Sequence, residues 1–226
     1  MTFIKICGIT NLEDARISVD NGADALGFVF AESPRKIMPE AAQKIISQLP
    51  SDKLYVGVFV DHSLKEIHEI KKYCGLNTIQ IHKDIADIDQ ITKDIRIIKG
   101  FRVKPDNPIP KFIDPNIIML LDTYSKSSHG GTGKTFDWQK AIDISNQQPI
   151  ILAGGLTPEN VTEAIETVNP FAVDVSSGVE KSKGLKDHNK ICNFIEKVRD
   201  TDFKKPSQQG YQNMNDYFMP YNSVGS

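Results

Sequence analysis

The chain has few cysteines, no long apolar run and almost no net charge, and each shortage excludes a class of protein. Its 226 residues include only three cysteines, Cys7, Cys74 and Cys192. These are too few and too scattered for a disulfide framework or a zinc site, both of which need closely spaced pairs. We therefore expect a protein of the reducing cytoplasm that holds no metal ion.

No stretch approaches the roughly 18 to 20 apolar residues that a transmembrane helix requires. The first ten residues, MTFIKICGIT, also lack a basic segment followed by an apolar one, so we expect no leader. With 27 Lys and Arg against 29 Asp and Glu, the net charge is -2. Nothing then attracts the whole chain to nucleic acid or to an anionic membrane. We expect a soluble, cytoplasmic protein with a local site for a small neutral or anionic ligand.

The sequence does contain short apolar segments that alternate with segments of helical period. Eight segments rich in Ile, Val, Leu and Phe are predicted to be strands: 3–7, 23–30, 54–61, 77–82, 96–103, 117–122, 149–155 and 171–177. Five segments with helical period and plausible helix starts are predicted to be helices: 11–22, 38–50, 63–75, 157–168 and 187–200. Three prolines leave room for only a short helix in 104–112.

Eight strands at a spacing of roughly 25 residues, each followed by a helix or a short substitute, predict an α/β fold, the (β/α)₈ TIM barrel. We expect a single catalytic domain over residues 1–200. An open doubly wound sheet is the main alternative, but it usually has fewer strands and a glycine fingerprint after the first, where this chain offers only Gly8. Residues 201–226, rich in Gln, Asn, Ser and aromatics without periodicity, are predicted to form a disordered tail outside the barrel.

The segment GGTGKT matches the end of a nucleotide-binding P-loop at Gly133, Lys134 and Thr135. The first glycine of that pattern is replaced by Ser128. Residues 123–127 also separate the loop from the preceding predicted strand, whereas a P-loop turns directly off its strand. These glycines therefore need an explanation other than a nucleotide.

Polar residues gather at the carboxyl ends of the predicted strands, where barrels of this class carry their chemistry. Because side chains alternate along a strand, residues two apart share a face. The pairs formed in this way are Lys5 with Cys7, Gln80 with His82, Leu120 with Asp122, and Asp174 with Ser176. If these faces point into the mouth of the barrel, a thiol, an imidazole and two carboxylates converge there.

Glycine-rich segments follow the last two predicted strands, at Gly154-Gly155 and at Ser177-Gly178. In this fold, backbone N–H groups of the corresponding loops bind phosphate. One such segment alone is ordinary turn chemistry. Two of them at these strands predict an anion site.

Six motifs occur in the order KICGIT, ESPRKI, IQIH, LLDTYSKSSHGGTGKTFDW, LAGGLTPENV and VDVSSGVE, within a likeness that runs from about residue 3 to residue 199. In this combination the chain resembles the phosphoribosylanthranilate isomerases. The resemblance implies conversion of N-(5′-phosphoribosyl)anthranilate to 1-(2-carboxyphenylamino)-1-deoxyribulose 5-phosphate, the third step of tryptophan synthesis from chorismate. It is an Amadori rearrangement, an intramolecular isomerisation that needs no organic cofactor or metal because the iminium intermediate is the electron sink.

The resemblance also implies roles for residues. Cys7 is the general base, Asp122 is the general acid and Arg35 faces the carboxylate of the anthranilate. The two glycine loops hold the phosphate, and Gly131 to Gly133 form a mobile cover over the substrate, which explains the GGTG segment. The full set of predicted substrate contacts is Arg35, Gln80, His82, Gly131, Gly154, Gly155, Asp174, Ser176, Ser177 and Gly178.

The chemistry sets requirements for the two proton-transfer groups. A cysteine base acts as the thiolate, whose free pKa is about 8.5, and we expect Lys5 to lower the pKa of Cys7. An acid at Asp122 must keep its proton near neutral pH, so its pKa must be raised by burial or by a neighbouring carboxylate such as Asp174. Asp61 is a competing acid, interpreted as a surface or helix-capping residue.

Two other functions remain open at this point. A sugar-phosphate isomerase of the histidine-biosynthesis type uses the same barrel and reaction, but it pairs aspartates at the first and a middle strand, and the first strand here offers Cys7. A non-catalytic barrel that binds a phosphoribosyl ligand would not need both proton-transfer residues. The expected partner is a small phosphosugar, without nucleic acid or membrane, and the expected assembly is a monomer or a homodimer.

Overall fold

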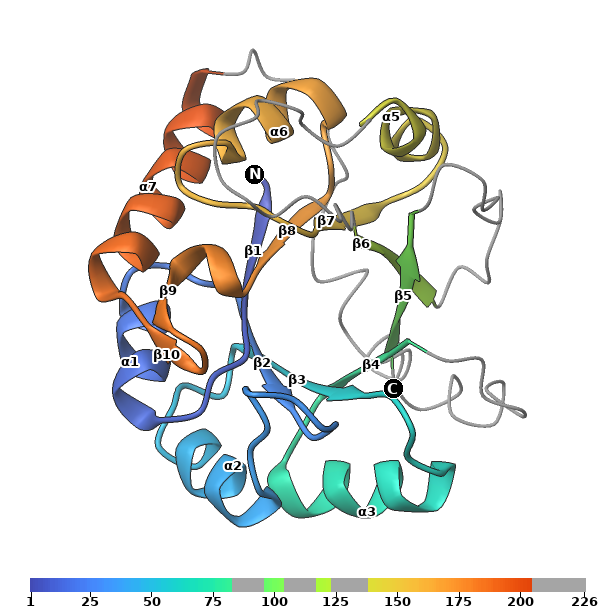
Figure 1. Ribbon diagram of the computed structural model, residues 1–226, viewed down its shortest axis with the longest axis vertical. Helices are drawn as coiled ribbons and strands as arrows, with labels where there is room; N and C mark the ends of the chain where they lie inside the picture. Colours follow the sequence, from blue (N-terminus) through green and yellow to red (C-terminus); the bar gives the residue numbers. More distant parts are fainter. Residues whose placement is uncertain (83–95, 104–116, 123–137, 205–226) are drawn as a thin grey trace, which may run out of the picture.

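Residues 1–82, 96–103, 117–122 and 138–204 are described by the computed structural model, and they form a closed barrel of eight parallel strands (Figure 1). The strands follow one another around the barrel in chain order, and β8 pairs with β1 to close it. This arrangement confirms the predicted TIM barrel. The strands are β1 Phe3–Cys7, β2 Ala25–Val29, β3 Leu54–Phe59, β4 Thr78–Ile81, β5 Arg96–Arg102, β6 Ile117–Asp122, β7 Ile150–Ala153 and β8 Ala172–Val175.

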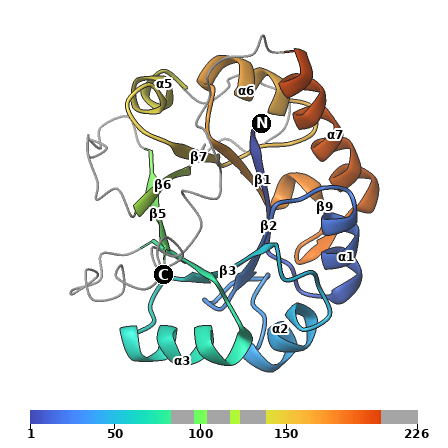
Figure 2. The same ribbon diagram turned by 180° about the vertical axis from the view of Figure 1, so that it is seen from behind.

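Helices surround the strands, as the views from the two ends of the barrel show (Figures 1 and 2). They are α1 Leu12–Asp20, α2 Pro39–Ile46, α3 Leu64–Cys74, α5 Gln139–Ser145, α6 Val161–Val168 and α7 His188–Lys204. None of the helices in the described part of the chain is both long and apolar enough to cross a bilayer. The short helix predicted in 104–112, the cover at Gly131 to Gly133 and the adjoining Lys134 and Thr135 lie outside the described residues.

Local capping signals mark the starts of two of the predicted helices, α1 and α3. Ser63 and Glu66 form a capping box at the start of α3, and Gly75 ends that helix with a φ of 74°. Asn11 caps α1 by accepting a hydrogen bond from the backbone N–H of Asp14. The sequence did not predict α5, whose N-cap residue, Trp138, makes no capping hydrogen bond with its side chain.

Strand alternation divides the core into two apolar layers. Ile4 and Ile6 of β1 face outward and join the large cluster between the strands and the helices. Phe3 faces inward and belongs to a smaller cluster that fills the barrel, with Val56 and Ile151 among its members. The inward face of β1 continues with Lys5 and Cys7, so the apolar filling gives way to polar groups toward the carboxyl end.

The two ends of the barrel sequence are fastened to each other. Thr2 donates from its backbone N–H and its hydroxyl to Asp202, at 2.6 and 2.7 Å, and Arg199 donates to the carbonyl of Thr2 at 2.6 Å. Thr201 is only 3% exposed. The predicted domain boundary after Asp200 therefore falls inside α7, which continues to Lys204, while 205–226 lie outside the described residues.

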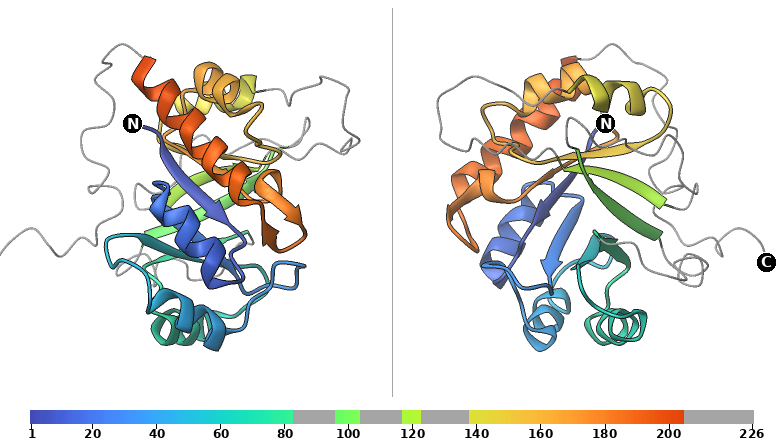
Figure 3. Two further views of the ribbon diagram at one scale, coloured as in Figure 1. Left: turned by 90° about the vertical axis from the view of Figure 1, so that its left-hand side faces the viewer. Right: turned by 45° about the vertical axis from the view of Figure 1, so that its right-hand side comes forward.

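A short hairpin that the sequence did not predict follows β8. It begins after a single 3₁₀ turn, Ser177–Val179, and consists of β9 Glu180–Ser182 and β10 Leu185–Lys186 in antiparallel pairing. Figure 3 shows the hairpin at the end of the barrel toward which β1 points. The hydroxyl of Thr10 donates to the carbonyl of Gly184 at 2.6 Å, which ties the hairpin to the loop after β1. The hairpin therefore lies at the rim where the catalytic residues were predicted.

Candidate active site

Lys5 and Cys7 point into the barrel from β1, and the absence of a side chain at Gly27 of β2 makes room for them. A methyl group at Gly27 would lie 2.7 Å from Cys7 Sγ and 3.2 Å from Lys5 Nζ. Lys5 Nζ donates to Asp174 Oδ1 of β8 at 2.8 Å, and both side chains are buried. The prediction that Lys5 and Cys7 share an inward face is confirmed.

Burial dominates the electrostatic setting of Cys7. It raises the pKa of the Cys7 thiol above its ordinary value, while Lys5 lowers that pKa, Asp174 raises it and Lys186 lowers it. The expectation that Lys5 lowers the pKa of Cys7 is therefore confirmed in direction. The pKa is nevertheless raised overall, because burial of the thiol outweighs the effect of Lys5.

The surroundings of Asp122 shift its pKa in the direction that a proton donor needs. It ends β6 beside Arg102 of β5. Burial raises the pKa of the Asp122 carboxyl, Asp174 raises it further, and Arg102 acts in the opposite direction. Asp174 thus acts on Asp122 as well as on Cys7, so these two groups share one polar region. The competing acid, Asp61, is exposed.

Gln80 and His82 form a polar pair on the wall made by β4. Gln80 Nε2 lies 2.9 Å from His82 Nε2, and the His82 ring lies over β5, where a methyl group at Gly100 would come within 2.5 Å of its Cε1 and Nδ1. Burial, with Lys5 as the next cause, lowers the pKa of His82, which favours the neutral form of its ring. Gln80 is 3% exposed, and its Oε1 has no hydrogen-bond partner among the described residues. A buried acceptor of this kind is costly unless a ligand satisfies it.

The guanidinium of Arg35 is engaged by a carboxylate of the protein itself, which the sequence did not predict. Arg35 Nε donates to Glu180 Oε1 at 2.7 Å and Nη2 donates to Oε2 at 2.8 Å. This fork uses one edge of the guanidinium. No hydrogen bond of Nη1 is found among the described residues, so the predicted contact with a substrate carboxylate would involve that second edge.

The loops after β7 and β8 touch each other. Gly154 and Gly155 have φ values of 86° and 71°, a conformation that favours glycine. A methyl group at Gly178 would lie 1.9 Å from the carbonyl oxygen of Leu156, so only glycine permits this approach. Ser176 closes the gap to β1, with its Oγ 3.1 Å from where a methyl group at Gly8 would lie. The structure thus brings the two predicted phosphate loops together, with Ser177 exposed beside them.

Two buried charged residues at this rim, Glu180 and Lys186, were not predicted. Glu180 directly follows the SSGV segment, so its closeness to a functional motif was the available signal. Lys186 lies in the polar segment KSKGLK, which gives no sign of burial. Among the described residues, no group of three or more His, Cys, Asp or Glu side chains is arranged to hold a metal ion.

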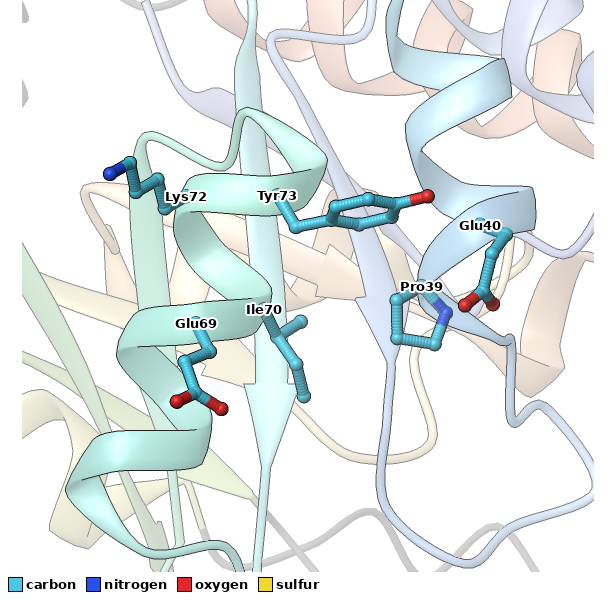
Figure 4. Close-up of a pocket in the computed structure, with 6 residues that line it drawn as sticks. All are labelled: Pro39, Glu40, Glu69, Ile70, Lys72 and Tyr73. Atoms are coloured by element: carbon cyan, nitrogen blue, oxygen red, sulfur yellow. The ribbon is translucent and has the colours of Figure 1, made fainter.

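A groove of about 590 Å³ lies elsewhere, between α2 and α3 on the outside of the barrel (Figure 4). The Tyr73 ring extends across it toward Pro39. Its lining residues all come from these two helices and are Pro39, Glu40, Glu69, Ile70, Lys72 and Tyr73. None of the strand-end residues contributes to this groove, so it is separate from the candidate site in the mouth of the barrel.

Comparisons with known proteins agree with this geometry. The family model described as N-(5′-phosphoribosyl)anthranilate (PRA) isomerase matches residues 4–197. An N-(5′-phosphoribosyl)anthranilate isomerase from a Geobacter species is 47% identical over 201 residues, which cover 88% of this chain and 98% of that protein.

Solved structures give the same relationship. Phosphoribosyl anthranilate isomerase from Thermotoga maritima superposes with a TM-score of 0.78 and 42% identity, over 88% of this chain and 100% of that one. A further isomerase structure, in complex with reduced 1-(o-carboxyphenylamino)-1-deoxyribulose 5-phosphate, has a TM-score of 0.76 and 39% identity over the same shares of the two chains. The chain therefore belongs to the N-(5′-phosphoribosyl)anthranilate isomerase family.

Proposed function

We infer that this protein converts N-(5′-phosphoribosyl)anthranilate to 1-(2-carboxyphenylamino)-1-deoxyribulose 5-phosphate in tryptophan biosynthesis, at the mouth of its barrel. The assignment of the reaction rests on family membership. The observation that supports the site is the polar region around Asp174, whose charge acts on both a buried thiol, Cys7, and a carboxyl group with a raised pKa, Asp122. Cys7 is proposed as the base and Asp122 as the acid.

Asp122 acts first, in the opening of the ribose ring. Its raised pKa favours the protonated form that can donate to the ring oxygen. As the C1′–O bond breaks, the lone pair of the anilino nitrogen forms an iminium at C1′. Asp122 is left ionised beside the new hydroxyl group.

Cys7 acts second, as the thiolate that removes the proton from C2′. The electrons of the C–H bond form a C1′–C2′ double bond, and the iminium becomes a neutral enolamine. Protonation at C1′ and loss of the hydroxyl proton at C2′ then give the ketone. Burial raises the pKa of Cys7, and the positive charge of the iminium counters this effect when the thiolate is needed.

The remaining predicted contacts orient the substrate. The second edge of the Arg35 fork suits the carboxylate of the anthranilate, because a guanidinium offers two parallel donors to a planar anion. The loops at Gly154-Gly155 and Ser177-Gly178 are proposed to bind the phosphate through backbone N–H groups. Gln80 Oε1, which has no hydrogen-bond partner among the described residues and lies next to His82, suits a hydroxyl of the sugar.

We place the protein in the cytoplasm on the basis of its three free, scattered cysteines. The assembly proposed from the sequence is a monomer or a homodimer. A relative from Thermotoga maritima is dimeric, and monomers generated from it have been solved. Size-exclusion chromatography with light scattering decides between the two states for this chain.

The test of the catalytic pair uses matched controls on the same protein. Cys7→Ala and Asp122→Asn should each lower kcat by about 10² or more, the usual effect of removing a positioned base or acid. The controls are Cys192→Ala on α7 and Asp61→Asn after β3, which lie outside the proposed machinery. Turnover is followed by the change in anthranilate fluorescence. An Asp122→Asn enzyme as fast as Asp61→Asn would remove the acid assignment.

A further inference from the structure

Lys186 is a lysine without solvent exposure at the carboxyl end of the barrel. Its Nζ donates to the carbonyl of Cys7 at 2.6 Å, to the carbonyl of Ser176 at 3.1 Å and to Glu180 Oε1 at 3.2 Å. An ammonium group has three donors, so three acceptors use all of them. The charge is thereby paired, and the group is held in one position.

These contacts join the two strands that close the barrel. Cys7 ends β1 and carries the proposed base, whereas Ser176 follows β8 at the start of the proposed phosphate loop. Burial of an ammonium group costs free energy unless the group is paired and hydrogen-bonded, so the contacts of Lys186 must offset this cost. Two of these contacts are to backbone carbonyls, at the end of β1 and just after β8, which are the two segments whose relative position the proposed reaction depends on.

The hairpin that carries Lys186 is itself fastened to α1. The backbone N–H of Lys186 donates to Asp14 Oδ2 at 2.9 Å, and His188 Nε2 lies 2.9 Å from Asp14 Oδ1. The Asn11 side chain also donates to Asp14 at 2.8 Å. The backbone of Lys186 is therefore held in place by its hydrogen bond to α1.

Glu180 links Lys186 to Arg35. Both of its oxygens accept from the Arg35 fork, and Oε1 also accepts from Lys186. The side chain of Glu180 is 5% exposed and that of Arg35 is 23% exposed. The pairing takes the edge of the guanidinium that includes Nε, which leaves the other edge for the substrate.

We propose that Lys186 and Glu180 are positioning residues of the isomerisation, with Lys186 fixing the end of β1 that carries Cys7 and Glu180 fixing the orientation of Arg35. This proposal rests on the roles proposed above for Cys7 and Arg35. Neither residue touches the reacting atoms, so each acts through the group that it holds.

Removal of the Lys186 charge also has an electrostatic consequence. The charged groups that act on Cys7 are Lys5 from β1, Asp174 from β8, Lys186 from the hairpin and Arg35 from the loop after β2. Burial raises the pKa of Cys7, and Lys186 is one of the groups that lower it. Without Lys186 the thiolate should form at higher pH.

The first experiment tests Glu180 through Arg35. In the wild-type background, Glu180→Gln should raise KM for N-(5′-phosphoribosyl)anthranilate by about tenfold with kcat changed less, because Arg35 loses a charged partner and its fixed orientation. In an Arg35→Ala background the same substitution should change KM by less than about twofold, because the group it orients is gone.

The outcomes of this cycle are distinct. An unchanged KM in Arg35→Ala would remove the proposed role of Arg35. A raised KM in Arg35→Ala together with an unchanged KM in Glu180→Gln would leave that role intact and overturn the positioning role of Glu180. Equal effects of Glu180→Gln in both backgrounds would also overturn it.

The second experiment compares Lys186→Met with Lys183→Met, an exposed lysine of the same hairpin. Lys186→Met should lower kcat by about 10-fold to 10²-fold, because a small displacement of the base is enough for such a loss. It should also move the pH profile of kcat/KM, and the pH dependence of Cys7 alkylation, to higher pH. Lys183→Met should leave all three quantities as in the wild type.

If Lys186→Met does not fold, as judged by circular dichroism, Lys186→Gln is measured in its place because it keeps a hydrogen-bond donor without the charge. A folded variant with wild-type kcat and an unshifted alkylation profile would overturn the role of Lys186. A variant with lower melting temperature but unchanged kcat and pH profile would show a purely structural role and would also overturn it.

Discussion

Lys5 Nζ and Asp174 Oδ1 lie 2.8 Å apart inside the barrel, although 169 residues separate them in the chain. Both are buried, on the strands that meet where the barrel closes. Two charges removed from water gain from their attraction only when both are present. Lys5 also interacts with Cys7, so the residue that pairs with Asp174 also affects the pKa of the proposed base.

Lys5→Met should destabilise the protein by about 3–5 kcal/mol, because it leaves the Asp174 charge buried and without its ammonium partner. The control is Lys36→Met, which breaks an exposed pair with Glu32 and should cost less than about 1 kcal/mol. Denaturant unfolding measures both. If the two variants lost the same free energy of unfolding, the buried ion pair would contribute no more to stability than the exposed one.

Asp122→Asn should stabilise the folded protein while it lowers kcat by about 10² or more. The pKa of Asp122 is raised in the folded state, so the folded state holds this proton more tightly than the unfolded state does. Stability therefore falls as pH rises from the ordinary aspartate pKa through the folded one. We expect Asn to raise Tm by about 2–4 °C at neutral pH, or roughly 1 kcal/mol.

The gain in Tm should disappear below about pH 4, where the aspartate is protonated in both states. Calorimetry across this pH range tests the sign directly, with Asp61→Asn as the exposed counterpart. A gain that is the same at every pH would argue against burial of the ionised carboxyl group as its cause.

Gly178→Ala should raise KM by about tenfold and change kcat less, because a methyl group at 1.9 Å from the Leu156 carbonyl must push the two proposed phosphate loops apart. Gly75→Ala is the control. Gly75 also has a positive φ, 74°, at the end of α3, and the nearest atom to an added methyl group is 4.0 Å away. It should cost about 1–2 kcal/mol of stability without a change in KM.

Two truncations separate α7 from the segment after it. Removal of 205–226 should leave Tm and activity unchanged, as expected from its composition. Removal of 201–226 also removes the buried Thr201 and the hydrogen bonds from Thr2 to Asp202. Its Tm should fall by at least about 4 °C. A fall of the same size in the shorter truncation would assign a packing role to the segment from residue 205.

Most of the barrel could be predicted because its strands carry strong local signals. Segments such as Phe3–Cys7 and Ile117–Asp122 combine apolar residues with a polar residue at the carboxyl end, and their regular recurrence sets the topology. The prediction that burial and Asp174 raise the pKa of Asp122 is confirmed, because both depend only on the strand ends meeting in one mouth.

The remaining features depend on contacts between segments that are distant in the sequence. Lys186 has the local context of a surface lysine, and its burial follows only from carbonyls at the ends of β1 and β8. The raised pKa of Cys7 arises because burial of the thiol outweighs the effect of Lys5, and spacing along β1 does not reveal how deeply the thiol is buried. Arg35 was correctly placed near the mouth, but its pairing with Glu180 depends on the unpredicted hairpin.

The links between Thr2 and the end of α7 have a consequence for synthesis on the ribosome. The strand made first can complete its pairing only with a strand made near the end, so a growing chain carries an open sheet with two unsatisfied edges. Such edges pair readily with other chains. Association of these edges with other chains therefore competes with closure of the barrel until β8 has been made.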